Sequence, residues 1–186
     1  MRSVALVVAA AAIAAGVLQV PDPPEPHIML ADKIVPADPP AAQGDGSVPD
    51  GVTLTPFDVQ NPAVGRLDPA LLRAVQNAAT QAKAAGITLT INSGWRSPEF
   101  QQRLLDQAVQ TYGSLAAARK YVQTPDMSKH VTGEAVDVGG AGADRWLINN
   151  GSRFGLCRIY ANELWHFELA ADAQGNCPAL LPNAAG

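Results

Sequence analysis

The sequence predicts an α+β fold in which helices pack on a small antiparallel sheet. Two observations predict this fold class. Segments with a helical period come early in the chain, and segments with a strand-like period cluster late. A short turn between the last two strand-like segments favours an antiparallel pair. The length of 186 residues is typical of one such domain with an appended tail.

Cap residues followed by proline mark the start of the two longest predicted helices. Asp68-Pro69 and Ser97-Pro98 each place a side-chain acceptor before a proline at the first helical position. Apolar residues then recur at helical spacing, and Gly86 supplies a stop for the first helix. The predicted helices cover about residues 69–82, 98–108, 115–122 and 144–148.

Short apolar segments, some alternating with polar residues, predict the strands. Ile87, Leu89 and Ile91 alternate with polar residues, which is the period of a half-buried strand. A later strand carries Asp137 between two valines, before a pair of glycines. The predicted strands cover about residues 87–91, 134–138, 156–160 and 164–169.

Two segments are predicted to precede the folded domain. Residues 1–20 contain one positive charge, Arg2, before an apolar run, which is typical of a secretory signal peptide. The alternative is an uncleaved N-terminal segment that tethers the protein to a membrane. Residues 21–50 are rich in proline and lack apolar periodicity, which predicts an extended linker. The domain is therefore expected over residues 51–186, exported and either held at the cell envelope or secreted.

Charge and cysteine content narrow the function classes. The net charge of −4 argues against a nucleic-acid-binding protein, which should show a basic patch. Cys157 and Cys177 are the only cysteines, and their spacing matches no Cys-x-x-Cys metal or redox motif. Two cysteines in an exported protein usually pair, so we predict a disulfide between them.

Two of the three histidines, together with one aspartate, predict a zinc site. His130 lies in a polar loop that contains glycine, and His166 follows a tryptophan. Asp137 lies in the middle of a strand, where a buried carboxylate is costly unless it is paired or binds a cation. Two imidazoles and one carboxylate leave a fourth zinc position for water, which is the arrangement of catalytic sites.

A glutamate beside the last predicted ligand is a candidate base for that water. Glu163 precedes His166 by three residues, in the turn before the strand. Glu168 competes for the role, because it shares the His166 face of a regular strand. We favour Glu163 as the group that takes the proton of the attacking water and passes it to the leaving amine.

Three motifs resemble those of the zinc D-alanyl-D-alanine carboxypeptidases. They are Ser93-Gly94-Trp95-Arg96-Ser97, Ser128-x-His130-x-x-Gly133-x-Ala135-x-Asp137 and Glu163-x-Trp165-His166. This family includes the vancomycin-resistance carboxypeptidase and D-Ala-D-Ala dipeptidases, and it shares a fold with the Hedgehog signalling domain. The resemblance covers about residues 52–169.

The resemblance implies roles for the residues of these motifs. His130, Asp137 and His166 are implied zinc ligands, and Glu163 is the implied catalytic base. Arg96 is expected to stabilise the developing oxyanion or to orient the scissile carbonyl, since a fixed guanidinium suits both tasks.

Three further motif residues are expected near the substrate. Ser128 matches a serine of the family, and Trp165 lies between the expected base and the last ligand. Trp95 stands where the family usually has tyrosine, so any contact made by that phenolic hydroxyl is missing here.

The function expected from the resemblance is removal of the terminal D-alanine from peptidoglycan stem peptides, by a monomer with zinc as cofactor. A D-Ala-D-Ala dipeptidase or a peptidoglycan endopeptidase is an alternative within the same family. A non-catalytic zinc module that binds cell-wall peptides is a third hypothesis. Glu163 argues against the third hypothesis, because a binding module has no use for a base.

Overall fold

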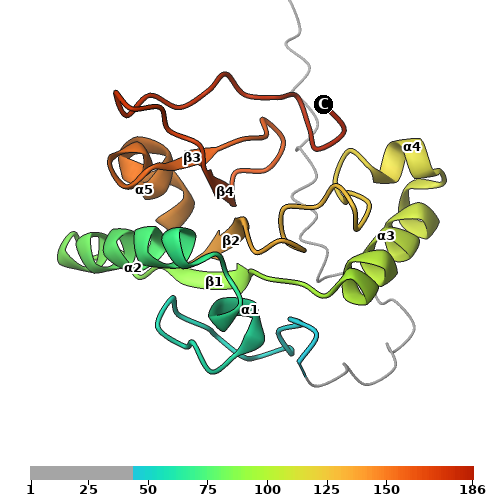
Figure 1. Cartoon of the computed structure of the whole chain (residues 1–186), viewed down its shortest axis with the longest axis horizontal. Helices are drawn as coiled ribbons and strands as arrows, with labels where there is room; N and C mark the ends of the chain where they lie inside the picture. Colours follow the sequence, from blue (N-terminus) through green and yellow to red (C-terminus); the bar gives the residue numbers. More distant parts are fainter. Residues whose placement is uncertain (1–43) are drawn as a thin grey trace, which may run out of the picture. The chain divides into compact units, whose positions relative to one another are not determined.

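The computed structural model describes residues 44–186, so the predicted leader (1–20) and most of the predicted linker (21–50) lie outside the described residues. Within residues 44–186, no helix is long and apolar enough to cross a membrane. The elements in chain order (Figure 1) are α1 (Pro62–Gly65), α2 (Pro69–Ala84), β1 (Thr90–Ser93), α3 (Pro98–Tyr112), α4 (Leu115–Ala118), β2 (Ala135–Gly139), α5 (Ala143–Asn150), the 3-10 helix η1 (Gly151–Phe154), β3 (Leu156–Arg158) and β4 (His166–Leu169).

The four strands form one antiparallel sheet in the order β1-β2-β4-β3. In its register, Asp137 on β2 pairs with His166 on β4 and, on the other side, with Ser93 on β1. A shift in register between Ile91 and Ser93 marks an irregularity at this end of β1. The predicted α+β class is confirmed, and the sheet brings two residues of separate motifs side by side.

The two longest helices begin at the caps that the sequence predicts. The Asp68 carboxylate accepts hydrogen bonds from the backbone N–H groups of Ala70 and Leu71. The Ser97 hydroxyl accepts one from the N–H of Phe100. These side chains satisfy amide donors that have no partner within the first helical turn.

The main core lies between the sheet and helices α2 and α5, which pack against each other and against the strands (Figure 1). Helix α2 contributes Leu71 and Val75, and the sheet contributes Ile91, Val136 and Phe167. Helices α3 and α4 pack on each other around a second, smaller cluster. The buried members of that cluster are Leu105, Ala108, Ala118 and Val122.

The helix predictions differ from the structure in extent. The segment predicted as a helix over 115–122 is helical only over Leu115–Ala118, and turns follow it. Helix α5 matches its predicted position closely. Helix α1 was not predicted, although Asn61-Pro62 is the same cap-plus-proline signal, because four residues are too few for a helical period.

The strand predictions differ at the ends. Strand β1 starts and ends later than the predicted 87–91, and β3 and β4 are shorter than the predicted 156–160 and 164–169. The connection between β3 and β4 is a longer loop rather than a tight turn. The reason is tertiary: Tyr160 forms a bridge with Leu181 from the C-terminal segment instead of continuing the pairing with β4.

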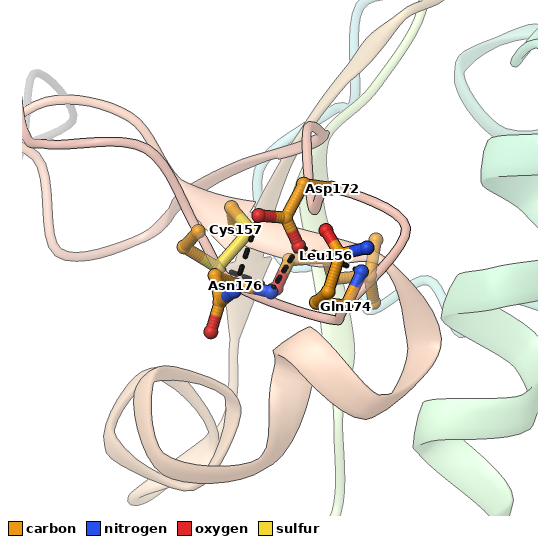
Figure 2. The surroundings of a disulfide bond; sticks show 6 residues. Leu156, Cys157, Asp172, Gln174 and Asn176 are labelled. Carbon is orange, nitrogen blue, oxygen red and sulfur yellow. Dashed lines mark hydrogen bonds between the residues drawn. A yellow bond between two sulfur atoms is a disulfide. The ribbon is translucent and has the colours of Figure 1, made fainter.

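A disulfide joins β3 to the C-terminal segment. Cys157 and Cys177 are bonded, with their Cα atoms 5.5 Å apart, which confirms the predicted pair. Beside the disulfide, the Asp172 carboxylate accepts hydrogen bonds from the backbone N–H groups of Gln174 and Asn176 (Figure 2). This turn carries the chain from β4 back to the bonded cysteine.

Candidate metal centre and active site

Three buried residues form the His-Asp-His triad: His130, Asp137 and His166. Asp137 and His166 lie opposite each other on β2 and β4, and His130 comes from the loop before β2. His166 Nδ1 lies 3.1 Å from Asp137 Oδ1, and His130 Nε2 lies 3.4 Å from Asp137 Oδ2. One ligand atom from each residue lies within 4.8 Å of the others.

The donors of this triad fit zinc. Two imidazole nitrogens and a carboxylate oxygen are ligands that zinc prefers, and bonds of about 2.0–2.2 Å need donors this close together. His130 Nδ1 lies 2.8 Å from the carbonyl oxygen of Gly94, and His166 Nε2 lies 3.0 Å from Glu168 Oε1. A proton on each of these outer nitrogens leaves the inner nitrogens, His130 Nε2 and His166 Nδ1, free to bind a metal.

Charge is concentrated around Asp137. Burial alone would raise the pKa of Asp137, but His130, His166 and Arg96 outweigh burial and hold this pKa well below its usual value. Burial lowers the pKa of His130, and Arg96 lowers it further. Burial also opposes protonation of His166, but hydrogen bonds to Asp137 and Glu168 raise its pKa to about 9. The centre therefore keeps a carboxylate anion beside a neutral His130.

Glu163 lies on the triad side of His166. Its Oε2 is 3.7 Å from His166 Nδ1, the nitrogen that faces Asp137. Its Oε1 is buried and has no hydrogen-bond partner among residues 44–186. Burial raises the pKa of Glu163 to about 7. A buried acceptor without a partner is costly unless another molecule, such as water, occupies the space beside it.

Glu168 lies on the opposite side of the same ring. Its Oε1 contacts His166 Nε2, which points away from Asp137. Glu168 does share the strand face of His166, as its spacing predicted. Its contact with the outer nitrogen suits it to orient the imidazole.

Arg96 is nearly buried and is held by three partners. Its Nε donates to Ser93 Oγ at 2.8 Å, its Nη1 to Gln101 Oε1 at 3.0 Å, and its Nη2 to Asp137 Oδ2 at 2.9 Å. A guanidinium has five N–H donors, so two remain for another acceptor. Arg96 thus borders the triad with spare donors.

Gln101 belongs to this site and was not predicted. It is 1% exposed, and its Nε2 donates to the carbonyl oxygen of Gln123 while its Oε1 accepts from Arg96. The signal was present in the sequence, because Gln101 shares a helical stripe with Leu105 and Ala108, where a polar residue is unexpected.

Tyr160 is a second residue that the sequence did not indicate. Its ring centroid lies 5.0 Å from that of His166, and burial raises its pKa to about 12. Tyr160 lies in the loop between β3 and β4, outside the three motifs that the sequence singled out.

The three residues expected near the substrate lie in different environments. Ser128 is buried in the turn that leads to His130. Trp95 is half-buried, with the Arg66 guanidinium over its ring at 4.4 Å. Trp165 is exposed just before β4.

The fold and the site together define a class: an α+β domain with a buried three-donor metal centre and a neighbouring glutamate. The family model of VanY, described as D-alanyl-D-alanine carboxypeptidase, matches residues 65–171. The chain belongs to this family. The match covers all residues of the triad, together with Glu163, Glu168 and Arg96.

Comparison with individual proteins agrees with the family. A D-alanyl-D-alanine carboxypeptidase from Enterococcus faecalis is 31% identical over 127 residues, which are 55% of this chain and 47% of that protein. The chain thus spans about half the length of this curated relative.

Two VanY structures are among the solved structures that resemble the chain. A mutant of the vancomycin-resistance D,D-pentapeptidase VanY from the VanB-type cassette, in complex with Zn(II), has a TM-score of 0.52 and 31% identity, covering 55% of this chain and 71% of that one. VanYB in complex with D-alanine-D-alanine has a TM-score of 0.52 and 30% identity, covering 55% and 70%.

Proposed function

We propose that this protein is a zinc-dependent D-alanyl-D-alanine carboxypeptidase that removes the terminal D-alanine from peptidoglycan stem peptides. The observation that carries the proposal is the buried triad with Glu163 beside it: Oε2 of Glu163 lies 3.7 Å from His166 Nδ1, and its buried Oε1 has no partner among residues 44–186. Family membership and similarity to a Zn(II) complex and to a D-alanine-D-alanine complex support the metal and the substrate class.

His130 Nε2, Asp137 and His166 Nδ1 would hold the zinc. A zinc ion in such a set supplies Lewis acidity toward a water molecule and a peptide carbonyl. The Gly94 carbonyl and the Glu168 carboxylate orient the two imidazoles through their outer nitrogens. The site residues are therefore held in place before substrate arrives.

Glu163 is the general base in this mechanism. In the metal-free site, burial raises the pKa of Glu163 to about 7, so this carboxylate holds a proton more strongly than an ordinary glutamate does. Glu163 takes a proton from the attacking water at a carboxylate oxygen and then delivers it to the nitrogen of the leaving D-alanine. The two free N–H groups of Arg96 can donate to the oxygen of the scissile carbonyl as negative charge develops on it.

Export is part of the same proposal. Peptidoglycan lies outside the cytoplasmic membrane, and the apolar run within residues 1–20 is a candidate signal or anchor. The proline-rich residues that follow would let residues 51–186 reach the cell wall as a separate domain.

The test is mass spectrometry of a wall pentapeptide ending in D-Ala-D-Ala after incubation with the zinc-loaded protein. Loss of a single alanine is expected, and a chelator should abolish it. A matched peptide ending in L-Ala-L-Ala is the control and should stay intact. Loss of a dialanine would indicate a dipeptidase, internal fragments would indicate an endopeptidase, and an unchanged pentapeptide would contradict the enzyme proposal.

A further inference from the structure

Residues 45–47, here called the latch, pack against the domain although the sequence predicted them as linker. Asp45 is 6% exposed, and its carboxylate accepts from the N–H of Ser47 at 2.9 Å. It also forms an ion pair with Arg103 of α3 at 2.5 Å. Burial disfavours its charge, but the bonds to Ser47 and Arg103 outweigh burial and lower the pKa of Asp45. The ion pair between Asp45 and Arg103 therefore holds the latch against α3.

The backbone of the latch lies directly against the loop that carries Arg96. The N–H of Ser97 donates to the carbonyl oxygen of Asp45 at 2.8 Å. A Cβ atom built on Gly46 would lie 2.0 Å from the carbonyl oxygen of Trp95, closer than real Cβ atoms approach. Gly46 also has a φ of +90°, which favours glycine. The contact therefore requires glycine at position 46.

Three segments hold the backbone on both sides of Arg96. The N–H of Trp95 donates to Ala63, the N–H of Arg96 donates to His130, and the N–H of Ser97 donates to Asp45 of the latch. Ser97 also caps α3, the helix that supplies Gln101 to the Arg96 guanidinium. The latch is thus one of three supports for the loop, and it contacts the residues immediately before and after Arg96.

We propose that the latch is a positioning element for Arg96. It lies upstream of residues 65–171, the part matched by the family model. Displacement of a substrate-orienting group by about 1 Å can cost on the order of 10²-fold in rate. An altered latch should therefore reduce turnover although it contacts no residue of the triad. The inference rests on the proposed function of Arg96, so its test includes a readout that does not depend on activity.

The first variant is Gly46→Ala, with Gly51→Ala as its matched control. Both glycines have a positive φ, +90° and +77°, but a Cβ at Gly51 meets no described atom within 4 Å. Gly46→Ala should lower kcat by up to about 10²-fold and speed amide hydrogen exchange at residues 95–97. Zinc content and exchange in α2 should match those of the control. Equal kcat and equal amide exchange at residues 95–97 in the two variants would overturn the proposal that the latch positions Arg96.

A second variant keeps the proposal testable if Gly46→Ala does not fold. Asp45→Asn removes the ion pair with Arg103 but keeps the backbone contact with Ser97. A smaller fall in kcat and faster exchange of the Ser97 amide are expected, and no change in either would count against the latch. If the unmodified protein cleaves no stem peptide, the proposed function fails. Amide exchange at residues 95–97 then decides by itself whether the latch positions the loop that carries Arg96.

Discussion

At the scale of single residues, two glutamates contact opposite edges of one imidazole. Glu163 approaches His166 Nδ1, the nitrogen that faces Asp137, and Glu168 binds Nε2 on the far edge. Strand alternation alone places only Glu168 on the His166 face, because Glu163 lies in the turn before the strand. Their positions fit the proposed base, Glu163, and an orienting carboxylate, Glu168, and these two proposed roles predict different losses.

Glu163→Gln should lose turnover while keeping zinc. The amide preserves the shape of the side chain but cannot accept a proton, and loss of a general base typically costs about 10²–10⁴ in rate. The loss should appear in kcat rather than KM, measured with the stem pentapeptide. Glu134→Gln is the control, because Glu134 forms a half-exposed surface ion pair with Lys129. Full activity of Glu163→Gln would refute the assignment.

Glu168→Gln should instead weaken zinc binding. Loss of a carboxylate that orients a histidine ligand typically costs about 10–100-fold in metal affinity. Competition with a chelator measures this affinity, and kcat at saturating zinc should fall far less than in Glu163→Gln. An unchanged zinc affinity together with lost turnover would show that the roles of Glu163 and Glu168 are reversed.

At the scale of elements, the sheet register assembles the site. Asp137 lies between Ser93 of β1 and His166 of β4, so three sequence motifs meet across three adjacent strands. The neighbouring strand β3 pairs Cys157 with Glu168, which places the disulfide one strand away from His166. The disulfide therefore holds the edge strand β3, which pairs with the strand that carries Glu168.

Removal of the disulfide should cost stability more than activity. A bond that closes a sequence separation of 20 residues stabilises by about 3 kcal/mol on the chain-entropy estimate. The double variant Cys157→Ser with Cys177→Ser should lower the free energy of unfolding by about that amount in urea. A reductant should destabilise the unmodified protein and leave the variant unchanged. If the reductant shifts the variant equally, the effect does not come from this bond.

At the scale of the whole molecule, the metal centre links the sheet to the loop before β2. Zinc bound only by the folded state adds its binding free energy to stability, about 4 kcal/mol at a concentration a thousandfold above Kd. Without the metal, three ionisable groups remain buried together. The zinc-free domain should therefore show a pH dependence that the loaded domain lacks.

The zinc-free domain should lose stability as pH rises from about 6.5 to about 9. Its folded-state pKa for His166, about 9, lies above the ordinary value of 6.5. Protonation of His166 therefore stabilises the folded state. This contribution to the free energy of unfolding is complete below pH 6.5 and is lost as pH rises through 9. Glu163, with a pKa raised from 4.5 to about 7, acts in the same direction at lower pH.

Urea unfolding of the chelated protein across that window measures the effect. The zinc-loaded protein is the control, because a metal on His166 Nδ1 replaces the proton. A chelated domain that gains stability over the same interval would contradict the His166 assignment.

The sequence by itself determined the fold class, the two helix starts at Asp68 and Ser97, and the three motifs of the site. These follow from local rules, since a cap or a helical period is complete within a few residues. The donor types also followed from the sequence, because two imidazoles and a buried carboxylate have few uses other than binding a metal.

Only the tertiary structure decided which edge of His166 each glutamate contacts, that Gln101 and Tyr160 join the site, and that the latch packs beside Arg96. Each of these depends on the meeting of segments that are distant in sequence, and short-range periodicity carries no information about such a meeting. The ends of β3 and β4 changed for the same reason, because the C-terminal segment competes for the backbone hydrogen bonds of Tyr160 and its neighbours.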